Sequence, residues 1–192
     1  TRVFVHESLY DKFVKKAAKM AKAKKIGDPF EEGVENGPLI SQVQMDKVLN
    51  YIKIGSQEGA KLVCGGKRMK RKGYFVETTI FADVTDEMTI AKEEIFGPVM
   101  SIFKFKTIDE VIERANNSNH GLVSGVVTQS LDSAIKISNK MKSGQVYVNC
   151  WAANQASTPF GGFKESGIGR ELGQKSLDGY LETKCVIIKT NE

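Results

Sequence analysis

The chain has 192 residues, of which 41% are hydrophobic, and its 28 Lys and Arg against 23 Asp and Glu give a formal net charge of +5. Its apolar runs are only a few residues long, far below the roughly 20 that a transmembrane helix needs. The three cysteines include no CxxC pair, which argues against a disulfide framework and a zinc ribbon. The composition is that of an ordinary globular protein with a core of its own.

Helical and extended patterns alternate along the first 149 residues. The spacing of apolar residues predicts helices over 8–25, 41–58, 107–116 and 130–142, with a short helical turn at 88–93. Extended patterns fall at 2–6, 61–64, 74–84, 99–105, 123–128 and 145–149. Strands separated by helices favour an α/β fold, a mostly parallel twisted sheet with helices on both faces. Thr107 and Glu110 have the spacing of a capping box at the start of one helix.

Two short stretches carry the excess positive charge. Residues 12–25 contain seven lysines and residues 67–72 contain five basic residues, and neither stretch contains an acidic residue. The first is predicted to follow an N-cap at Ser8 and to bury one apolar side, formed by Leu9, Phe13, Ala17 and Met20. The second lacks the interleaved aromatics on which bases stack. We interpret both stretches as solvated surface and expect neither a nucleic-acid nor a membrane partner.

The regular pattern ends after residue 149. A polar loop at 150–158 leads to a Gly-rich segment at 159–173, a short helix near 171–180 and a final strand over 183–189. A lone strand at this place must pair with a sheet edge, and another subunit is one such edge. At the other end, Thr1 leads directly into a β-branched stretch. We therefore expect the chain to begin inside a fold.

Standard catalytic motifs are absent from the sequence. There is no GxSxG, HExxH or GxxxxGK[ST], and the two histidines, His6 and His120, lie apart from any thiol or serine motif. Cys150 is a minor candidate nucleophile, because it follows a predicted strand where α/β sheets place their ligands, whereas Cys64 and Cys185 are predicted to be buried. The glycines of 161–173 lack the GxGxxG spacing, so we interpret them as close-packing positions. No metal site is predicted.

The segment Ala91-Lys92-Glu93-Glu94-Ile95-Phe96-Gly97-Pro98-Val99 is the most distinctive part of the chain. A carboxylate at such a junction before a strand can accept two hydrogen bonds from the hydroxyls of a ribose. A Phe two residues later can face the same side and pack on a planar ring. The spacing alone equally fits a solvated Glu pair with Phe96 in the core.

"AKEEIFGPV" and "STPFGGFKESGIGRELG" resemble the NAD(P)-dependent aldehyde dehydrogenases, in the C-terminal part of their catalytic domain. "TRVFVHESLYDKFV", "GDPFEEGVENGPLIS", "QEGAKLVCGG" and "ERANNSNHGL" resemble the same family in the same order, so the resemblance covers essentially the whole chain. The pattern is most similar to the cytosolic and mitochondrial class that oxidises aliphatic aldehydes and retinal.

The resemblance implies roles for eight residues. Glu94 and Phe96 would hold the nicotinamide ribose and flank the nicotinamide ring. Gln44 and Lys47, one helical turn apart, resemble positions that reach the same cofactor. Phe160 resembles an aromatic that lines the aldehyde tunnel. The loop 151–157, with Trp151, Ala152 and Asn154, resembles the variable substrate-entrance loop.

The resemblance also implies what the chain lacks. The family's nucleophilic Cys, its general-base Glu and its nucleotide-binding domain would all lie upstream of Thr1, so we expect no catalytic residue here and no activity from the chain alone. NAD is the expected cofactor, and NADP stays open because its selector lies in the absent domain. The alternative is a structural or binding module that kept the fold without the chemistry.

The expected organisation has two parts. Residues 1–180 would form the C-terminal part of the catalytic domain, and residues 181–192 would form an oligomerisation strand in a homo-oligomer, a dimer or a tetramer. The expected substrate is an aldehyde. The expected location is the cytoplasm, with the mitochondrial matrix as the alternative.

Overall fold

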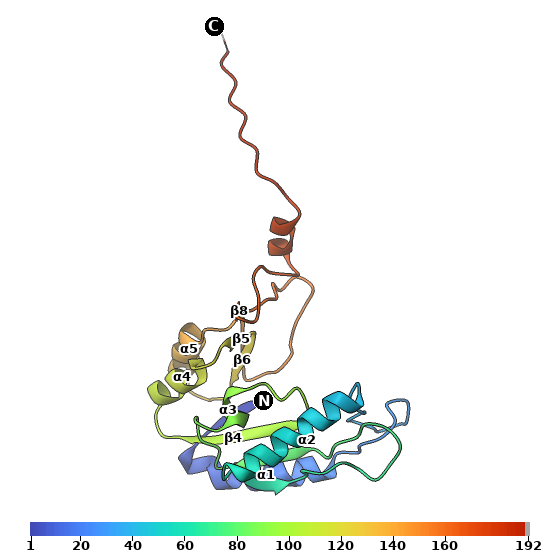
Figure 1. Cartoon of the computed structure of the whole chain (residues 1–192). Coiled ribbons are helices and arrows are strands. Elements are labelled where there is room, and N and C mark those ends of the chain that lie inside the picture. Colours follow the sequence, from blue (N-terminus) through green and yellow to red (C-terminus); the bar gives the residue numbers. More distant parts are fainter. Residues whose placement is uncertain (191–192) are drawn as a thin grey trace. The chain divides into compact units, whose positions relative to one another are not determined.

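The computed structural model describes residues 1–190 and divides the chain into two compact units, Thr1–Val111 and the residues from Ile112 onward (Figure 1). The α/β class predicted from the sequence is confirmed, because each unit combines helices with parallel strand pairs. The sequence did not indicate the boundary between Val111 and Ile112. It falls within a helix that the pattern predicted as one continuous element.

The first unit is built around a four-stranded sheet with the order β1-β4-β3-β2. Strand β4 pairs in parallel with both of its neighbours, and the edge strand β2 pairs with β3 in the antiparallel sense. The strands are β1 (Arg2–His6), β2 (Lys61–Cys64), β3 (Thr79–Ala82) and β4 (Val99–Phe105). The helices are η1 (Glu7–Leu9), α1 (Tyr10–Ala23), α2 (Gln42–Gln57) and α3 (Thr89–Lys92).

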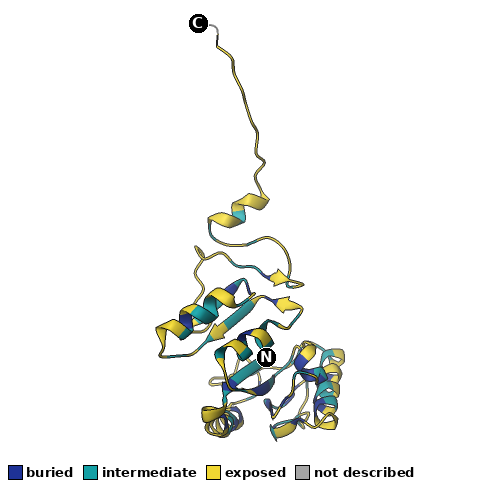
Figure 2. Cartoon of the chain, turned by 90° about the vertical axis from the view of Figure 1, so that its left-hand side faces the viewer, coloured by how far each residue is buried: buried dark blue, intermediate teal, exposed yellow. Residues whose placement is uncertain are grey.

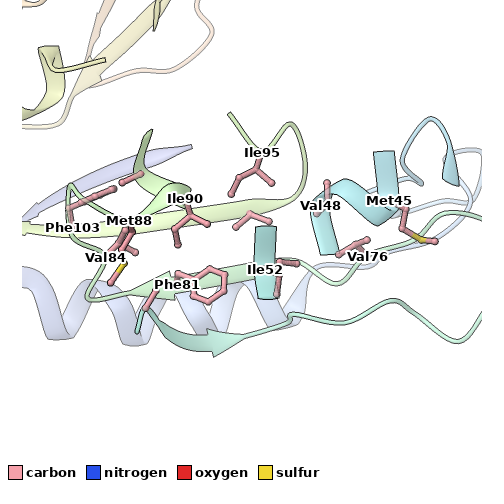
Figure 3. Close-up of a cluster of buried hydrophobic side chains, with 13 residues drawn as sticks. Met45, Val48, Ile52, Val76, Phe81, Val84, Met88, Ile90, Ile95 and Phe103 are labelled. Carbon is pink, nitrogen blue, oxygen red and sulfur yellow. The ribbon is translucent and has the colours of Figure 1, made fainter. Parts of the chain in front are cut away.

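Helices cover both faces of this sheet, as the sequence predicted. Phe81 and Phe103 project from β3 and β4 into a cluster with α2 and α3, which includes Val48 and Ile90 (Figure 3). Their chain neighbours Ile80 and Ile102 point to the opposite face and pack against α1. The alternation follows from the two-residue period of a strand. A sheet that is buried on both faces also explains why these strands read as continuous apolar runs rather than as alternating ones.

Helix α1 differs from its prediction in phase. Leu9, Phe13 and Met20 are exposed, whereas Tyr10 and two alanines form the buried side. The Tyr10 hydroxyl donates to the carbonyl of Ile102 at 3.4 Å and accepts from the backbone N–H of Asp83 at 2.6 Å, which fixes how the helix is rotated. Small side chains on that side allow a close approach to the sheet. The predicted Ser8 cap is also wrong, because Ser8 lies in η1 and α1 has no side-chain cap.

The second unit contains two short sheets instead of the single continuous sheet that the sequence suggested. Strands β6 (Val123–Val126) and β7 (Gln145–Val148) pair in parallel, while β5 (His120–Gly121) and β8 (Phe163–Lys164) form a two-residue antiparallel ladder. The helices are α4 (Ile108–Asn116), which begins in the first unit, α5 (Leu131–Lys140) and η2 (Gln174–Gly179). The predicted capping box at α4 is confirmed by reciprocal hydrogen bonds between Thr107 and Glu110.

The predicted strand at 183–189 is not formed within this chain. Residues 181–190 have no regular secondary structure and are exposed, as the yellow C-terminal stretch in Figure 2 shows. Residues 191–192, the end of the predicted oligomerisation strand, lie outside the described residues. To form a strand, these residues would have to pair with a sheet edge of another subunit. The role of residues 181–192 in an oligomer therefore stays a prediction.

Candidate functional site

The junction between α3 and β4 presents two of the predicted cofactor residues to solvent. Ile95 is buried, whereas Glu94 and Phe96 on either side of it are exposed, with Phe96 at 73%. Phe96 adopts a left-handed backbone conformation with φ 56°, which is uncommon for a bulky residue and here carries the ring outward. The core position that the spacing also allowed is therefore occupied by Ile95 instead of Phe96.

Helix α2 is joined to the junction between α3 and β4 by hydrogen bonds and close packing. Ser41 caps the helix by accepting a hydrogen bond from the backbone N–H of Gln44 at 3.2 Å. The Gln44 side-chain amide then donates to the carbonyls of Ile95 at 3.3 Å and Phe96 at 2.9 Å. Gly97 completes the contact, because a Cβ there would lie 2.5 Å from a methyl group of Val48. Gln44 thus fixes the backbone on which Glu94 and Phe96 are presented.

Lys47 lies near the same junction and contacts Tyr51, a residue that the sequence analysis did not single out. Its Nζ lies 5.8 Å from the ring centroid of Tyr51, one helical turn further along α2. The Tyr51 hydroxyl donates to the Glu93 carboxylate at 2.7 Å, and this hydrogen bond is the main reason that the pKa of Tyr51 is raised above 10.0. The i to i+4 spacing of Lys47 and Tyr51 was the signal that could have found this pair.

The first unit therefore gathers all four predicted cofactor residues on adjoining elements. They comprise one exposed carboxylate, one exposed aromatic ring, one ammonium group and an amide that fixes the backbone: Glu94, Phe96, Lys47 and Gln44. Such a donor set fits a ribose and the planar ring attached to it, because the carboxylate can accept hydroxyl hydrogen bonds and the ring offers a face for packing.

The second unit gathers three of the predicted substrate residues on the loop after β7. Trp151 is 67% exposed and packs against Tyr147, with ring centroids 5.4 Å apart. Ala152 is exposed and left-handed at φ 53°. The Asn154 side-chain oxygen accepts from Gln145 Nε2 at 3.1 Å and also from the Tyr147 hydroxyl.

Gln145 and Tyr147 were missed by the sequence analysis. They lie two residues apart on β7 and so project to the same side of the strand. The Tyr147 hydroxyl also lies 3.0 Å from Gln145 Oε1, so its single proton is shared between Gln145 and Asn154. Together they link the loop to a paired strand. Their two-residue spacing directly before a predicted entrance loop was the available signal.

Phe160 is placed by the Gly-rich segment. Its backbone exchanges two hydrogen bonds of 2.7 Å with Glu171, and it lines a surface pocket with Leu122 and Arg170. A side chain at Gly144 would meet the carbonyl oxygen of Gly161, and one at Gly162 would meet Ser166. The close-packing interpretation is confirmed for Gly161, Gly162 and Gly173. It is wrong for Gly167 and Gly169, where a Cβ would meet nothing within 4 Å and the glycine instead serves a positive φ.

The three thiols differ in environment. Cys64 is buried as predicted, and burial raises the pKa of its thiol above 9.0. The prediction for Cys185 is wrong, because it is exposed, and Cys150 is exposed as well.

Within residues 1–190, no cluster of three or more His, Cys, Asp or Glu is arranged to hold a metal ion. No helix among these residues has the length and apolar character to cross a bilayer.

Comparison with known proteins places this geometry in a family. The model of the "Aldehyde dehydrogenase family" matches residues 1–186. This chain belongs to the aldehyde dehydrogenase family. It is 52% identical to "Aldehyde dehydrogenase, cytosolic 2" of Macroscelides proboscideus over 192 residues, covering 100% of this chain and 80% of that one. It is also 52% identical to "Retinaldehyde dehydrogenase 3" of Rattus norvegicus over 192 residues, 100% of this chain and 38% of that protein.

Solved aldehyde dehydrogenases share the fold. An NAD+ complex of aldehyde dehydrogenase from Bacillus cereus superposes with a TM-score of 0.92 at 51% identity, covering 94% of this chain and 37% of that one. A double mutant of betaine aldehyde dehydrogenase from Staphylococcus aureus, in complex with NAD+, gives a TM-score of 0.95 at 37% identity, covering 100% and 39%. The chain thus spans under two fifths of the length of these solved proteins and of the rat relative.

Proposed function

We propose that this aldehyde dehydrogenase family chain takes part in the oxidation of aldehydes to carboxylic acids with NAD. Its first unit would bind the nicotinamide end of the cofactor, and its second would form part of the aldehyde tunnel. The observation that carries the proposal is the double hydrogen bond from Gln44 to the backbone of Ile95 and Phe96, which supports an exposed carboxylate and an exposed ring at one junction. Relatives that carry aldehyde or retinal dehydrogenase names support the reaction class.

Each cofactor residue has a role that its environment permits. NAD, when bound, accepts a hydride from the substrate. Glu94 would accept hydrogen bonds from the ribose hydroxyls, and Phe96 would restrict one side of the nicotinamide ring. Gln44 would act as a positioning residue, because its amide nitrogen is already committed to the junction backbone. Lys47 would add a positive charge next to Tyr51.

The second unit would shape the path of the aldehyde. Trp151, Ala152 and Asn154 would form the entrance loop, with Phe160 as the tunnel aromatic. The two hydrogen bonds accepted by Asn154 give the loop a defined shape, and a defined shape is the requirement for selecting among aldehydes.

We propose further that the isolated 192-residue chain is catalytically silent. If the chain follows the family pattern, the nucleophilic Cys and the general-base Glu would lie upstream of Thr1. Loss of a nucleophile and its base lowers the rate of acyl-transfer catalysis by many powers of ten.

The proposal also includes assembly into a homo-oligomer through residues 181–192. It includes a cytoplasmic location as well, which the cytosolic name of one relative supports.

A chimera tests the proposal. The matching 192-residue segment of rat retinaldehyde dehydrogenase 3 is replaced with this chain, and aldehyde-dependent NADH formation is followed by absorbance. We expect activity from the chimera and none from the isolated chain. A folded chimera without activity would favour the alternative, a structural or binding module, and NADH formation by the isolated chain would overturn the claim of silence.

A further inference from the structure

Helix α1 leaves an apolar strip uncovered on the outside of the first unit. Leu9, just before the helix, is 58% exposed, Phe13 is 37% exposed and Met20 is 61% exposed. At 100° per residue these positions fall within an arc of about 40° on the helix circumference. The buried side of the helix, with Tyr10, Ala18 and Ala21, lies elsewhere. The strip is therefore an accessible surface of the first unit and lies outside its core.

A row of lysines runs directly beside this strip. Lys12, Lys15, Lys16, Lys19 and Lys22 occupy the adjoining arc of about 120°. All five are exposed, and none forms an ion pair within residues 1–190. We call Leu9, Phe13, Met20 and these five lysines the α1 face.

A second basic segment contacts the chain that follows α1. The Arg71 guanidinium donates to the carbonyl of Ile26 at 3.2 Å and lies 4.4 Å from the Phe75 ring centroid, which ties the 67–72 loop to the residues that follow α1. Four further exposed basic residues stand on this loop: Lys67, Arg68, Lys70 and Lys72. The chain that follows α1 also carries carboxylates, and Lys24 pairs with Glu35 and Lys25 with Glu31. We therefore leave the 67–72 loop out of the α1 face, whose charge is that of the five lysines of α1.

We propose that the α1 face binds the surface of bilayers that contain anionic phospholipids. The lysines would contact the headgroup phosphates, and Leu9, Phe13 and Met20 would enter the boundary between headgroups and acyl chains. A basic row beside an exposed apolar strip is the pattern of helices that lie in the membrane interface. The expectation of no membrane partner rested on apolar runs too short to span a bilayer, which does not bear on binding at the membrane surface.

The apolar strip favours a membrane over a nucleic acid. Phosphate contacts alone would serve either partner. Burial of Leu and Met side chains stabilises a complex only where the partner offers an apolar phase, which a lipid interface does and a phosphate backbone does not. The 67–72 loop also lacks aromatic side chains on which bases could stack.

The test is co-sedimentation of the 192-residue chain with two kinds of vesicle, phosphatidylcholine alone and phosphatidylcholine with about 30% phosphatidylserine. We expect binding to the anionic vesicles that weakens as salt screens the lysines. Each lysine near such a surface contributes about fivefold in partitioning, so Lys12→Gln/Lys16→Gln/Lys19→Gln should lower it about a hundredfold. The matched control, Lys53→Gln/Lys142→Gln/Lys175→Gln, loses the same net charge elsewhere and should change partitioning less than threefold.

A variant that leaves the net charge unchanged distinguishes binding to a lipid surface from binding to any polyanion. Leu9→Ser/Met20→Ser should lower vesicle partitioning about tenfold while leaving weak retention on poly(U) unchanged. Far-UV circular dichroism checks folding, and Met20→Ser alone serves if the double variant unfolds. The proposal is overturned if the anionic vesicles bind no chain at low salt, or if the control triple variant loses as much as the α1 triple variant. It is also overturned if the Ser variants bind vesicles as well as the parent chain.

Discussion

Residues 1–111 and the residues from 112 onward differ in how they are held together. All but two of the buried hydrophobic residues described lie in the first unit, as the dark blue segments of Figure 2 indicate. The exceptions are Ile112 and Ala134. Each unit also buries two polar residues, Thr79 and Ser101 in the first and Ser143 and Gln145 in the second. In the second unit, where few apolar residues are buried, both form hydrogen bonds.

The difference shows that the candidate residues of the first unit and those of the second rest on different physical supports. In the first unit, Glu94 and Phe96 stand on a junction anchored by Ile95, a core residue. In the second, Trp151 and Asn154 stand on a loop that hydrogen bonds from β7 hold in place. Apolar burial resists local change through packing, whereas a polar network depends on each of its partners.

Among these predictions, Phe103→Ala should produce the largest loss of stability, because it removes a core side chain of the first unit. Phe103 is fully buried and stacks on Phe4 with ring centroids 4.7 Å apart, so its loss should lower the free energy of unfolding of the first unit by about 3–5 kcal/mol. Urea denaturation followed by circular dichroism measures the change. Val127→Ala, at an exposed site of the second unit, is the control and should change stability by less than about 0.5 kcal/mol. Equal losses for the two variants would contradict the contrast.

Tyr147→Phe should loosen the polar network with a smaller effect on stability. The variant removes the hydroxyl shared by Asn154 and Gln145, at a cost of about 1 kcal/mol. Trp151 is the only tryptophan of the chain and lies against Tyr147, so its fluorescence reports on the loop. We expect emission at longer wavelength and lower anisotropy.

The control for that experiment is Tyr180→Phe, which removes an exposed hydroxyl outside the network. Its emission spectrum should match that of the parent chain. A Tyr147→Phe chain with unchanged Trp151 emission would show that the loop keeps its shape without these hydrogen bonds.

The smallest expected effect is an alkaline loss of stability through Cys64. Burial raises the pKa of this thiol above 9.0, so the unfolded chain releases the proton first as pH rises. The free energy of unfolding should therefore fall above pH 9.0, by at most about 1.4 kcal/mol per pH unit from this group. Cys64→Ala should flatten this slope, and Cys185→Ala, at an exposed site, should leave it unchanged. Equal slopes in all three chains would exclude Cys64 as the cause.

Much of the first unit could be predicted from the sequence because its signals are local. Strands β1, β2 and β4 lie where the apolar runs placed them, and Thr107 caps α4 with Glu110 as the spacing indicated. The phase of α1 could not be predicted in this way, since the Tyr10 hydrogen bonds that set it come from residues more than 70 positions away.

The candidate site was predictable in part. The motif around Glu94 and Phe96 gave the exposed pair, but spacing alone could not tell whether Phe96 or Ile95 enters the core, because that choice depends on the left-handed backbone at Phe96. Tyr51 and Tyr147 were missed because each acts through a tertiary hydrogen bond, to Glu93 and to the entrance loop respectively. Hydrogen bonds of this kind are difficult to predict from a single sequence.

The most direct test of the proposed cofactor role compares two neighbouring carboxylates in the chimera with rat retinaldehyde dehydrogenase 3. Glu94→Gln removes the charge proposed to hold the ribose, whereas Glu93→Gln changes a carboxylate that already accepts a hydrogen bond from Tyr51. The account predicts that Glu94→Gln raises the KM for NAD about ten- to a hundredfold, the range for a hydrogen bond to a charged group, and that Glu93→Gln raises it less than threefold. Equal KM values for the two variants would contradict it.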